Sequence, residues 1–198
     1  MLKRPVFVYT ELSPNPNSMK FVLNFELVPE GLSFDYPSLA STMEEGSGSP
    51  LAGDLFQFPH VRRVFIASNF ITISKSEDIE WEEVLRDTKQ FIKIYFEENH
   101  PVFFEKTIEK NTLIVDSRDS DTIQKIKAAL DQYVRPAVES DGGAINFHSF
   151  NEDTGTVKVL LQGSCSGCPS STLTLKAGIE NLLTRMVPDV KEVVAEGV

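Results

Sequence analysis

The stretch Gly163-Ser164-Cys165-Ser166-Gly167-Cys168-Pro169-Ser170-Ser171 holds both cysteines of this 198-residue chain, separated by only two residues. Two thiols three positions apart on one turn can direct their sulfur atoms at a single atom. The pair therefore suits a metal, a metal cluster or a reversible local disulfide. Gly167 lies between the cysteines, and glycine permits a positive φ and a close approach of backbone N–H groups to a bound sulfide or thiolate.

An amphipathic helix is expected directly after this turn, with Ser170 or Ser171 as its N-cap. Apolar residues then recur at steps of three and four as far as Pro188. These residues are Leu175, Ile179, Leu182, Leu183 and Met186. The cysteines thus precede a helix N-terminus, where the macrodipole and the free N–H groups favour the metal-binding thiolate over the thiol.

The residues before the turn predict a helix and then a β-hairpin. Asp119 or Ser120 is expected to cap the helix, which has a kink at Pro136 and ends at Asp141-Gly142-Gly143. Its apolar stripe consists of Ile123, Ile126, Leu130, Tyr133, Val134 and Val138. Residues 144–150 and 156–161 are strand-like around the turn 151–155, and residues 190–195 can add a third strand. The predicted second domain, residues 120–198, is therefore helix, hairpin, cysteine turn, helix and strand.

The first half of the chain predicts a separate sheet with helices. Two hairpins are expected, one from residues 6–10 and 20–25 and one from residues 61–66 and 70–74. Ser49-Pro50 predicts the start of a short helix, and a longer amphipathic helix follows from Ile79, with Trp81 in the core. We predict an α+β fold of two small α+β domains, each a sheet packed with helices. Residues 1–98 form the first, and 99–119 form a linker that packs on one domain.

Composition narrows the possible partners. The net charge of −10 provides no basic field for phosphate backbones or anionic lipid, so we expect neither nucleic-acid nor membrane binding. No apolar run approaches the roughly 20 residues needed to cross a bilayer, and we expect no signal or transit peptide. Two cysteines confined to one turn form no disulfide framework, which favours a reducing cytoplasm.

The other chemically notable residues are expected to be structural. His60, His100 and His148 are isolated in the sequence and are predicted to be ordinary surface or core residues. Arg62-Arg63 is predicted to lie on a solvated strand face. The many Asp and Glu residues include no pair that can be assigned as a general acid and base.

Two uses of the cysteine pair would require a second chain. An iron–sulfur cluster or a tetrahedral metal usually takes four thiolates, and this chain has two. A symmetric dimer would bring two copies of Cys165 and Cys168 together and supply four sulfurs at its interface. Structural zinc would need the same arrangement.

Two other uses need one chain only. A thioredoxin-like dithiol also lies after a strand and before a helix, but here a hairpin rather than a parallel βαβ pattern is expected, and Pro169 follows the second cysteine. Residues 163–167 also mimic a nucleophile elbow with cysteine as the nucleophile. That fold requires a downstream histidine, and His148 lies upstream of Cys165.

Two quoted segments together resemble the Nfu family, that is, the NifU C-terminal-type domain. They are Val134-Arg135-Pro136-Ala137-Val138-Glu139-Ser140-Asp141-Gly142-Gly143 and the cysteine turn 163–171. The first half resembles the domain that precedes it in many Nfu proteins, through Ser13-Pro14-Asn15-Pro16-Asn17-Ser18-Met19-Lys20-Phe21 and the Trp81 helix. The resemblance covers nearly the whole chain except the linker.

This resemblance implies an iron–sulfur scaffold or carrier rather than an enzyme. Cys165 and Cys168 of two subunits would hold a 4Fe-4S cluster in a homodimer and pass it to apo-proteins, after loading by upstream cluster donors. A thiol–disulfide oxidoreductase that uses the Cys165/Cys168 dithiol is the alternative. Because the chain lacks the leading transit segment of mitochondrial members, a bacterial cytoplasmic form is expected.

Overall fold

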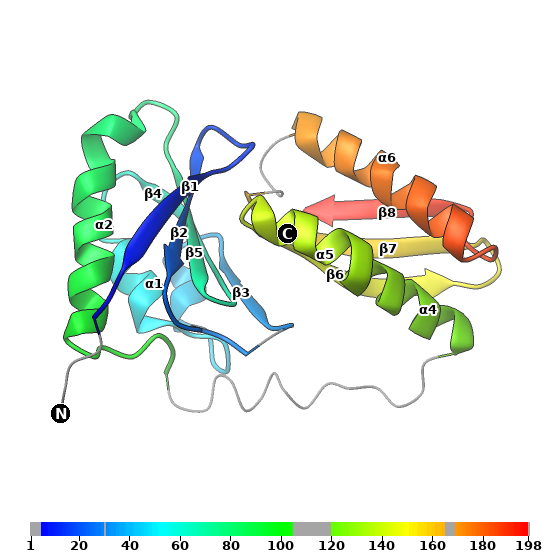
Figure 1. The fold of residues 1–198 in the computed structure, drawn as a ribbon, viewed down its shortest axis with the longest axis horizontal. Helices are drawn as coiled ribbons and strands as arrows, with labels where there is room; N and C mark the ends of the chain where they lie inside the picture. The colour runs from blue at the N-terminus through cyan, green and yellow to red at the C-terminus, as the bar shows by residue number, and fades with distance from the viewer. Residues whose placement is uncertain (1–4, 30, 105–119, 165–168, 198) are drawn as a thin grey trace. The chain divides into compact units, whose positions relative to one another are not determined.

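The computed structural model of this chain describes residues 5–29, 31–104, 120–164 and 169–197. The chain divides into two compact units, Met1–Ile114 and Val115–Val198 (Figure 1). The predicted linker limits, 99 and 119, remain a prediction, since most of that segment lies outside the described residues. No helix in the described ranges has the length and apolar character needed to cross a bilayer.

The first unit contains a five-stranded antiparallel sheet in the order β1-β2-β5-β4-β3. The strands are β1 (Val8–Leu12), β2 (Ser18–Leu23), β3 (Ser33–Tyr36), β4 (Val61–Ala67) and β5 (Phe70–Lys75). Both predicted hairpins are confirmed, and Ser68 in the β4–β5 turn has a φ of 44°. β-branched and aromatic residues are frequent in β4 and β5, as a buried pleated surface favours.

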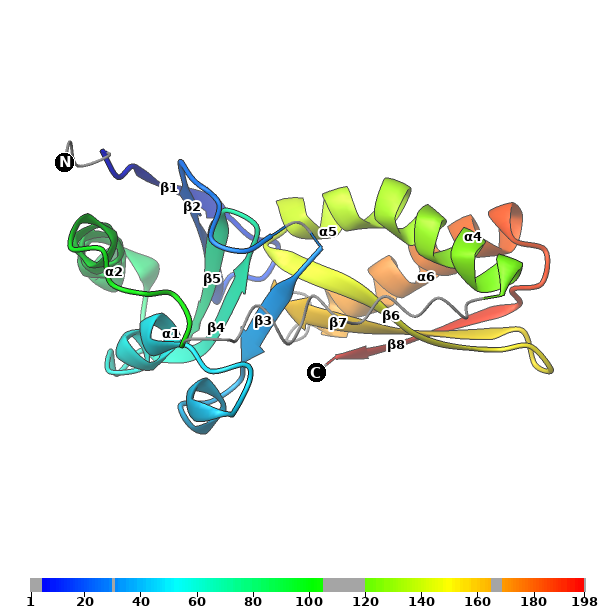
Figure 2. The same cartoon turned by 90° about the horizontal axis from the view of Figure 1, so that it is seen from below.

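Two helices, α1 (Pro50–Leu55) and α2 (Trp81–Glu97), cover one face of this sheet (Figures 1 and 2). A short 3-10 helix, η1 (Ala40–Met43), precedes α1. The predicted start of α1 is confirmed, because the Ser49 hydroxyl accepts a hydrogen bond from the Ala52 N–H. Trp81 is 8% exposed, and its indole N–H donates to the Pro16 carbonyl at 3.1 Å. That bond ties the proline-rich β1–β2 loop to the helix.

The chain leaves α2 through Asn99, whose φ is 60°. After it, Val102 and Phe103 pack against the apolar core of the first unit, and Phe103 lies 4.4 Å from Phe34 between ring centroids. The first part of the predicted linker therefore packs on this unit, as expected from its apolar residues. Residues 105–119 lie outside the described ranges.

The second unit is a three-stranded sheet, β6-β7-β8, with helices on one face (Figure 2). Its strands are β6 (Gly143–Asn151), β7 (Thr156–Gly163) and β8 (Glu192–Gly197). Its helices are α4 (Asp121–Ala129), the π-helical turn η2 (Leu130–Val134), α5 (Arg135–Ser140) and α6 (Pro169–Met186). The predicted hairpin and third strand are confirmed. The π-helical turn η2 ends at Val134, directly before Arg135-Pro136, and the kink expected at Pro136 stays a prediction.

Two predicted stripe residues are exposed instead. Tyr133 is 50% exposed, because the π turn changes the helical phase, and the buried positions continue with Val134 and Val138. Met186 is 44% exposed and is the last residue of α6, one turn beyond the buried Leu183. The other predicted apolar positions of α6 are buried or packed against the core.

The prediction that the cysteine turn has no parallel βαβ setting is wrong. β6 and β7 pair antiparallel, but β7 and β8 pair parallel, and α6 connects them. β7-α6-β8 is therefore a βαβ unit. β7 belongs both to a hairpin and to a βαβ unit, and the sequence pattern predicts only the hairpin.

The prediction of a solvated face for Arg62-Arg63 is wrong for Arg63. Its guanidinium donates two hydrogen bonds to the Asp35 carboxylate, at 2.7 and 2.6 Å. The Asp35 side chain is 6% exposed, so this pair joins β3 to β4 largely out of water. Arg62 is exposed, as expected.

Candidate functional site

The candidate site lies at the junction between the end of β7 and the start of α6. β7 ends at Gly163, Ser164 follows it, and α6 begins at Pro169. The predicted site residues, Cys165 and Cys168, lie outside the described residues, as does Gly167 between them. The structure therefore defines the two borders of the cysteine turn.

Ser164 anchors the first border. Its side chain is buried, with the residue 3% exposed, and its hydroxyl donates to the Asp141 carbonyl at 2.6 Å. The Ser164 N–H donates to the Gly142 carbonyl at 3.4 Å. These bonds bring the Asp141-Gly142-Gly143 turn, which ends α5, directly against the start of the cysteine turn.

Two glycines permit this close approach. Gly142 and Gly163 have φ values of 83° and 69°, which lie in the left-handed region that side chains disfavour. Gly163 is paired with Gly143 in the antiparallel β6–β7 register. A tight backbone-to-backbone frame therefore holds the residue that precedes Cys165.

The second border is the first turn of α6. The helix begins at Pro169, so the predicted N-cap at Ser170 or Ser171 is wrong. Proline suits the first helical position, because its φ is preset and its missing N–H would have no partner within the helix. Cys168 thus directly precedes the helix N-terminus, as predicted. That position favours a thiolate.

α6 is held firmly against its own sheet. Ile179 and Leu183 are almost completely buried, and a Glu180 carboxylate oxygen accepts from the Val193 N–H of β8 at 3.0 Å. Near the start of the helix, by contrast, Leu173 is 69% exposed. A large apolar side chain is therefore accessible in the first turns of α6, five positions after Cys168 in the sequence.

The three histidines have ordinary roles. His60 is 3% exposed, and its Nε2 lies 3.1 Å from the Thr88 hydroxyl. Burial, with a smaller contribution from the Arg62 charge, lowers the pKa of His60. His100 pairs with Glu98 at 3.0 Å, and His148 is exposed beside Ser149. Within the described ranges, no three His, Cys, Asp or Glu side chains are grouped so that they could hold a metal ion.

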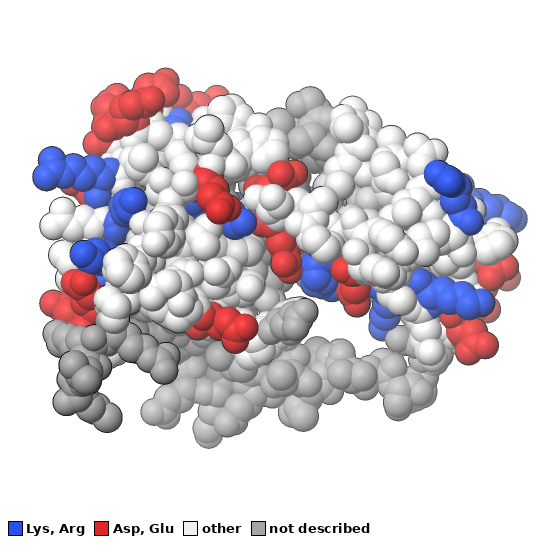
Figure 3. Space-filling view, in the orientation of Figure 1, with Lys and Arg blue, Asp and Glu red and all other residues white. Residues whose placement is uncertain are grey.

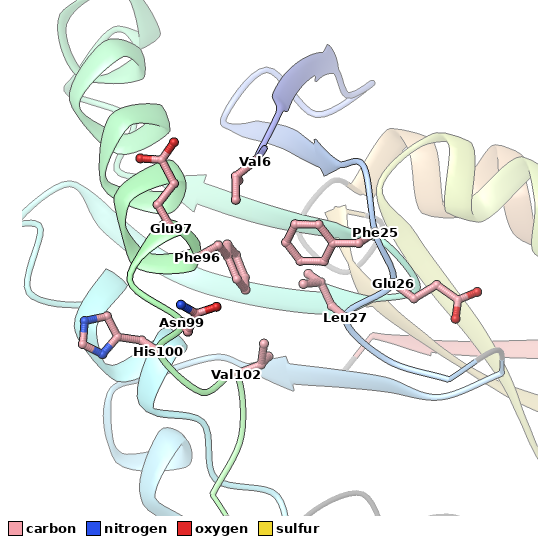
Figure 4. A pocket seen from close by; sticks show the side chains of 9 residues that line it. All are labelled: Val6, Phe25, Glu26, Leu27, Phe96, Glu97, Asn99, His100 and Val102. Atoms are coloured by element: carbon pink, nitrogen blue, oxygen red, sulfur yellow. The ribbon is translucent and has the colours of Figure 1, made fainter. Parts of the chain in front are cut away.

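A pocket of about 600 Å³ lies in the first unit (Figure 4). Phe25 and Phe96 in its wall point toward each other and meet edge to face, with ring centroids 5.2 Å apart, and Leu27 lies below them. Its remaining lining residues are Val6, Glu26, Glu97, Asn99, His100 and Val102. All of the lining residues belong to the first unit, whereas both cysteines belong to the second.

Two family models match the chain. The model described as "Scaffold protein Nfu/NifU N terminal" matches residues 8–99, and that described as "NifU-like domain" matches residues 126–194. The two matches fall in the first and second units respectively. The second match includes β7, the cysteine turn and α6.

Curated relatives match along nearly all of this chain. "NFU1 iron-sulfur cluster scaffold homolog, mitochondrial" of Drosophila willistoni is 42% identical over 193 residues, which cover 98% of this chain and 64% of the relative. "NifU-like protein 5, mitochondrial" of Arabidopsis thaliana is 39% identical over 196 residues, which cover 98% of this chain and 69% of the relative. The chain spans about two thirds of the length of these relatives.

Solved structures match less closely. The solution structure of a NifU-like protein from Saccharomyces cerevisiae has a TM-score of 0.45 at 20% identity, and the match covers 53% of this chain and 90% of that one. A crystal structure of a Staphylococcus aureus protein has a TM-score of 0.36 at 23% identity, with coverage of 45% and 99%. Both TM-scores are below 0.5.

The expectation of a bacterial cytoplasmic protein is contradicted by these relatives, because their names place them in mitochondria. That expectation depended on the residue at which the given sequence begins. The first residue of this chain, which spans only part of its relatives' length, is no evidence of a compartment.

Proposed function

This chain belongs to the Nfu/NifU family, and from that premise we propose that it is an iron–sulfur cluster scaffold or carrier. Cys165 and Cys168 of two subunits hold one 4Fe-4S cluster as cargo, which the homodimer receives from upstream donors and delivers to apo-proteins. The observation that supports the proposal is the match of the NifU-like domain model to residues 126–194, a range that includes Cys165 and Cys168.

The available donors fit this cargo. A 4Fe-4S cluster takes four thiolates, and each chain contributes two. Two copies related by a two-fold axis would supply four at one interface.

The surroundings of the turn fit a reversible site. The Ser164 anchor and the N-terminus of α6 fix the two ends of a short segment, and the α6 macrodipole favours thiolates there. A cluster bound by two short turns lies near solvent. Thiolates of a recipient protein can then replace these four ligands one at a time. In this account protein side chains make no bond in a substrate, so the chain is not an enzyme.

The first unit has a different role in this proposal. Both cysteines belong to the second unit. We assign the first unit to docking of donors or clients or to stabilisation of the chain.

Replacement of the cysteines tests the site directly. Cys165→Ser and Cys168→Ser are each expected to abolish stable cluster binding, measured as iron and acid-labile sulfide after anaerobic reconstitution. The fold should persist, with unchanged far-ultraviolet circular dichroism. A full cluster retained by either variant would refute the assignment.

One observation supports a thiol–disulfide oxidoreductase as the second candidate. The turn follows β7 and precedes α6 in a βαβ unit, which is the setting of thioredoxin-like dithiols. That activity needs one chain only. A metal-free monomer that cycles between dithiol and disulfide and reduces a protein disulfide would favour it over the carrier.

A further inference from the structure

β1 is an edge strand of the first sheet. Its neighbour in the described sheet is β2, and β1 and β3 form the two ends of the strand order. An edge strand presents a row of N–H and C=O groups that can pair with another strand. Natural edges are commonly protected by charged residues or by a very short strand. β1 spans five residues and includes one charged residue, Glu11.

β1 and the residue before it also expose large apolar side chains. Phe7 is 51% exposed, Tyr9 is 59% exposed and Leu12 is 84% exposed. Strand side chains alternate between faces, and Val8, 7% exposed, belongs to the apolar core on the α2 face. Tyr9 therefore lies on the face away from α2, where an added strand could pack beside it. Phe7, which precedes the strand, borders a groove beside α2.

A row of cations lies on the α2 side of the same edge. A groove of about 310 Å³ at the start of β1 is lined by Val6, Phe7 and Val8 and by Arg86, Lys89, Gln90 and Lys93 of α2. Residues at steps of three and four share one helix face, so these side chains form one stripe beside β1. Figure 3 shows Lys and Arg side chains over α2, in a chain whose net charge is −10.

These cations are largely unneutralised. Lys93 has a long ion pair, 3.7 Å, with Glu97 of the same helix. Within the described ranges, Arg86 and Lys89 make no ion pair. On the α2 side of the sheet, the side chains of an added strand would lie near Arg86, Lys89 and Lys93. On the other side they would lie near the exposed Tyr9.

We propose that β1 is a docking edge for an extended segment of a partner protein, in which acidic and apolar side chains alternate. Main-chain hydrogen bonds add this segment to the sheet as a sixth strand. Its acidic side chains face Arg86, Lys89 and Lys93, and its apolar side chains pack beside Tyr9. This inference concerns the first unit and does not depend on the cluster assigned to the second.

A second copy of this chain fits the edge poorly. If two β1 strands paired, the two α2 helices would bring their cationic stripes to the same new sheet, and like charges would repel. The second copy would pair its own β1 at this edge, and the side chains of that strand on the α2 side would lie near Arg86, Lys89 and Lys93. These side chains include Val8 and no acidic residue. The charge pattern therefore favours an acidic partner.

Synthetic peptides test the proposal on the full chain. The first probe has a central run of alternating Glu and Val, and the second has Lys in place of Glu. Binding is measured by fluorescence anisotropy and by backbone amide shifts. We expect the Glu peptide to bind at least about tenfold more tightly than the Lys peptide, with the largest shifts in β1.

Matched variants locate the site. The triple variant Arg86→Glu, Lys89→Glu and Lys93→Glu should lose at least about tenfold in affinity for the Glu peptide. The control triple Lys125→Glu, Arg185→Glu and Lys191→Glu makes the same charge change at exposed positions of the second unit and should retain it. Equal losses in both triples, or equal binding of both peptides, would overturn the proposal.

N-methylated peptides test strand addition itself. Methyl groups on one set of alternate amides should abolish binding, whereas methyl groups on the other set should leave it intact, because only one set faces β1. Equal effects of both sets would overturn the proposal. So would failure of the Glu peptide to bind at millimolar concentration, or concentration-dependent self-association with shifts in β1.

Discussion

At the scale of single residues, Ser164 anchors the backbone directly before the cysteine turn. Its buried hydroxyl donates to the Asp141 carbonyl, 23 positions earlier in the chain. Ser164→Ala removes this donor and should lower the free energy of unfolding by about 1 kcal/mol. Urea unfolding followed by circular dichroism measures the change. Loss of bound cluster to a chelator should also become faster, because the first border of the turn loosens.

The control for this variant is Ser149→Ala on β6, where the hydroxyl meets the exposed His148 at 3.2 Å. It should change stability by less than about 0.5 kcal/mol. If Ser164→Ala had no larger effect than this control, the anchoring role of Ser164 would be wrong.

A second residue, His60, makes the stability of the first unit depend on pH. Thr88 donates its hydroxyl proton to the Val84 carbonyl, so it accepts from a neutral His60 at Nε2. Burial lowers the pKa of His60, so as the pH falls below about 6.5 the unfolded chain takes up a proton that the folded chain does not. The contribution of His60 to the free energy of unfolding is therefore fully present above about pH 6.5. Below that pH it decreases by at most about 1.4 kcal/mol per pH unit.

The fluorescence of Trp81, the single tryptophan, reports this unfolding because Trp81 lies in the same core cluster as the first sheet. His60→Gln, which keeps an N–H donor without titrating, should show a shallower decline of stability between pH 7 and pH 5. Identical slopes for the variant and the unchanged chain would exclude His60 as the cause.

At the scale of elements, the β6–β7 turn depends on one glycine. Gly155 has a φ of 73°, and a Cβ there would lie 2.6 Å from the Asp189 carbonyl oxygen. Gly155→Ala should lower stability by about 2 kcal/mol or more, through both backbone strain and this contact. Gly178→Ala in α6 is the matched comparison, because nothing lies within 4 Å of its added Cβ. It should raise stability by about 0.5–1 kcal/mol, and equal effects in urea unfolding would contradict this account.

The elements that sequence could predict are those with local signals. Ser49-Pro50 marks the start of α1, and β-branched runs around short turns mark both hairpins of the first sheet. The parallel pairing of β7 with β8 has no such signal, because α6 separates the two strands. The Arg63–Asp35 pair was missed for the same reason, since its partners are 28 positions apart.

In the candidate site, too, local features could be predicted from the sequence, whereas contacts between distant segments could not. The two cysteines, their spacing and the helix after them can be read locally. The Ser164–Asp141 bond joins two segments that were interpreted separately, one as a helix stop and one as a ligand turn. Both segments are part of the resemblance to the Nfu family. That resemblance was the available sequence signal that the two segments lie close together.

At the scale of the whole molecule, the two units divide the proposed work. The second unit carries both cysteines on a turn between β7 and α6, and the first carries the open edge of β1 beside a cationic helix face. A carrier needs both a site for its cargo and a surface that recognises other proteins. In this account a client or donor is selected at the first unit, and the cluster is exchanged at the second.

The central claim is that two chains share one cluster, and one measurement tests it most directly. Iron, acid-labile sulfide and native mass are determined together on the full chain, reconstituted without oxygen. The account predicts about four irons and four sulfides per dimer, with the dimer favoured by loading. A loaded monomer, a dimer with zinc alone, or a metal-free monomer that cycles between dithiol and disulfide would contradict it.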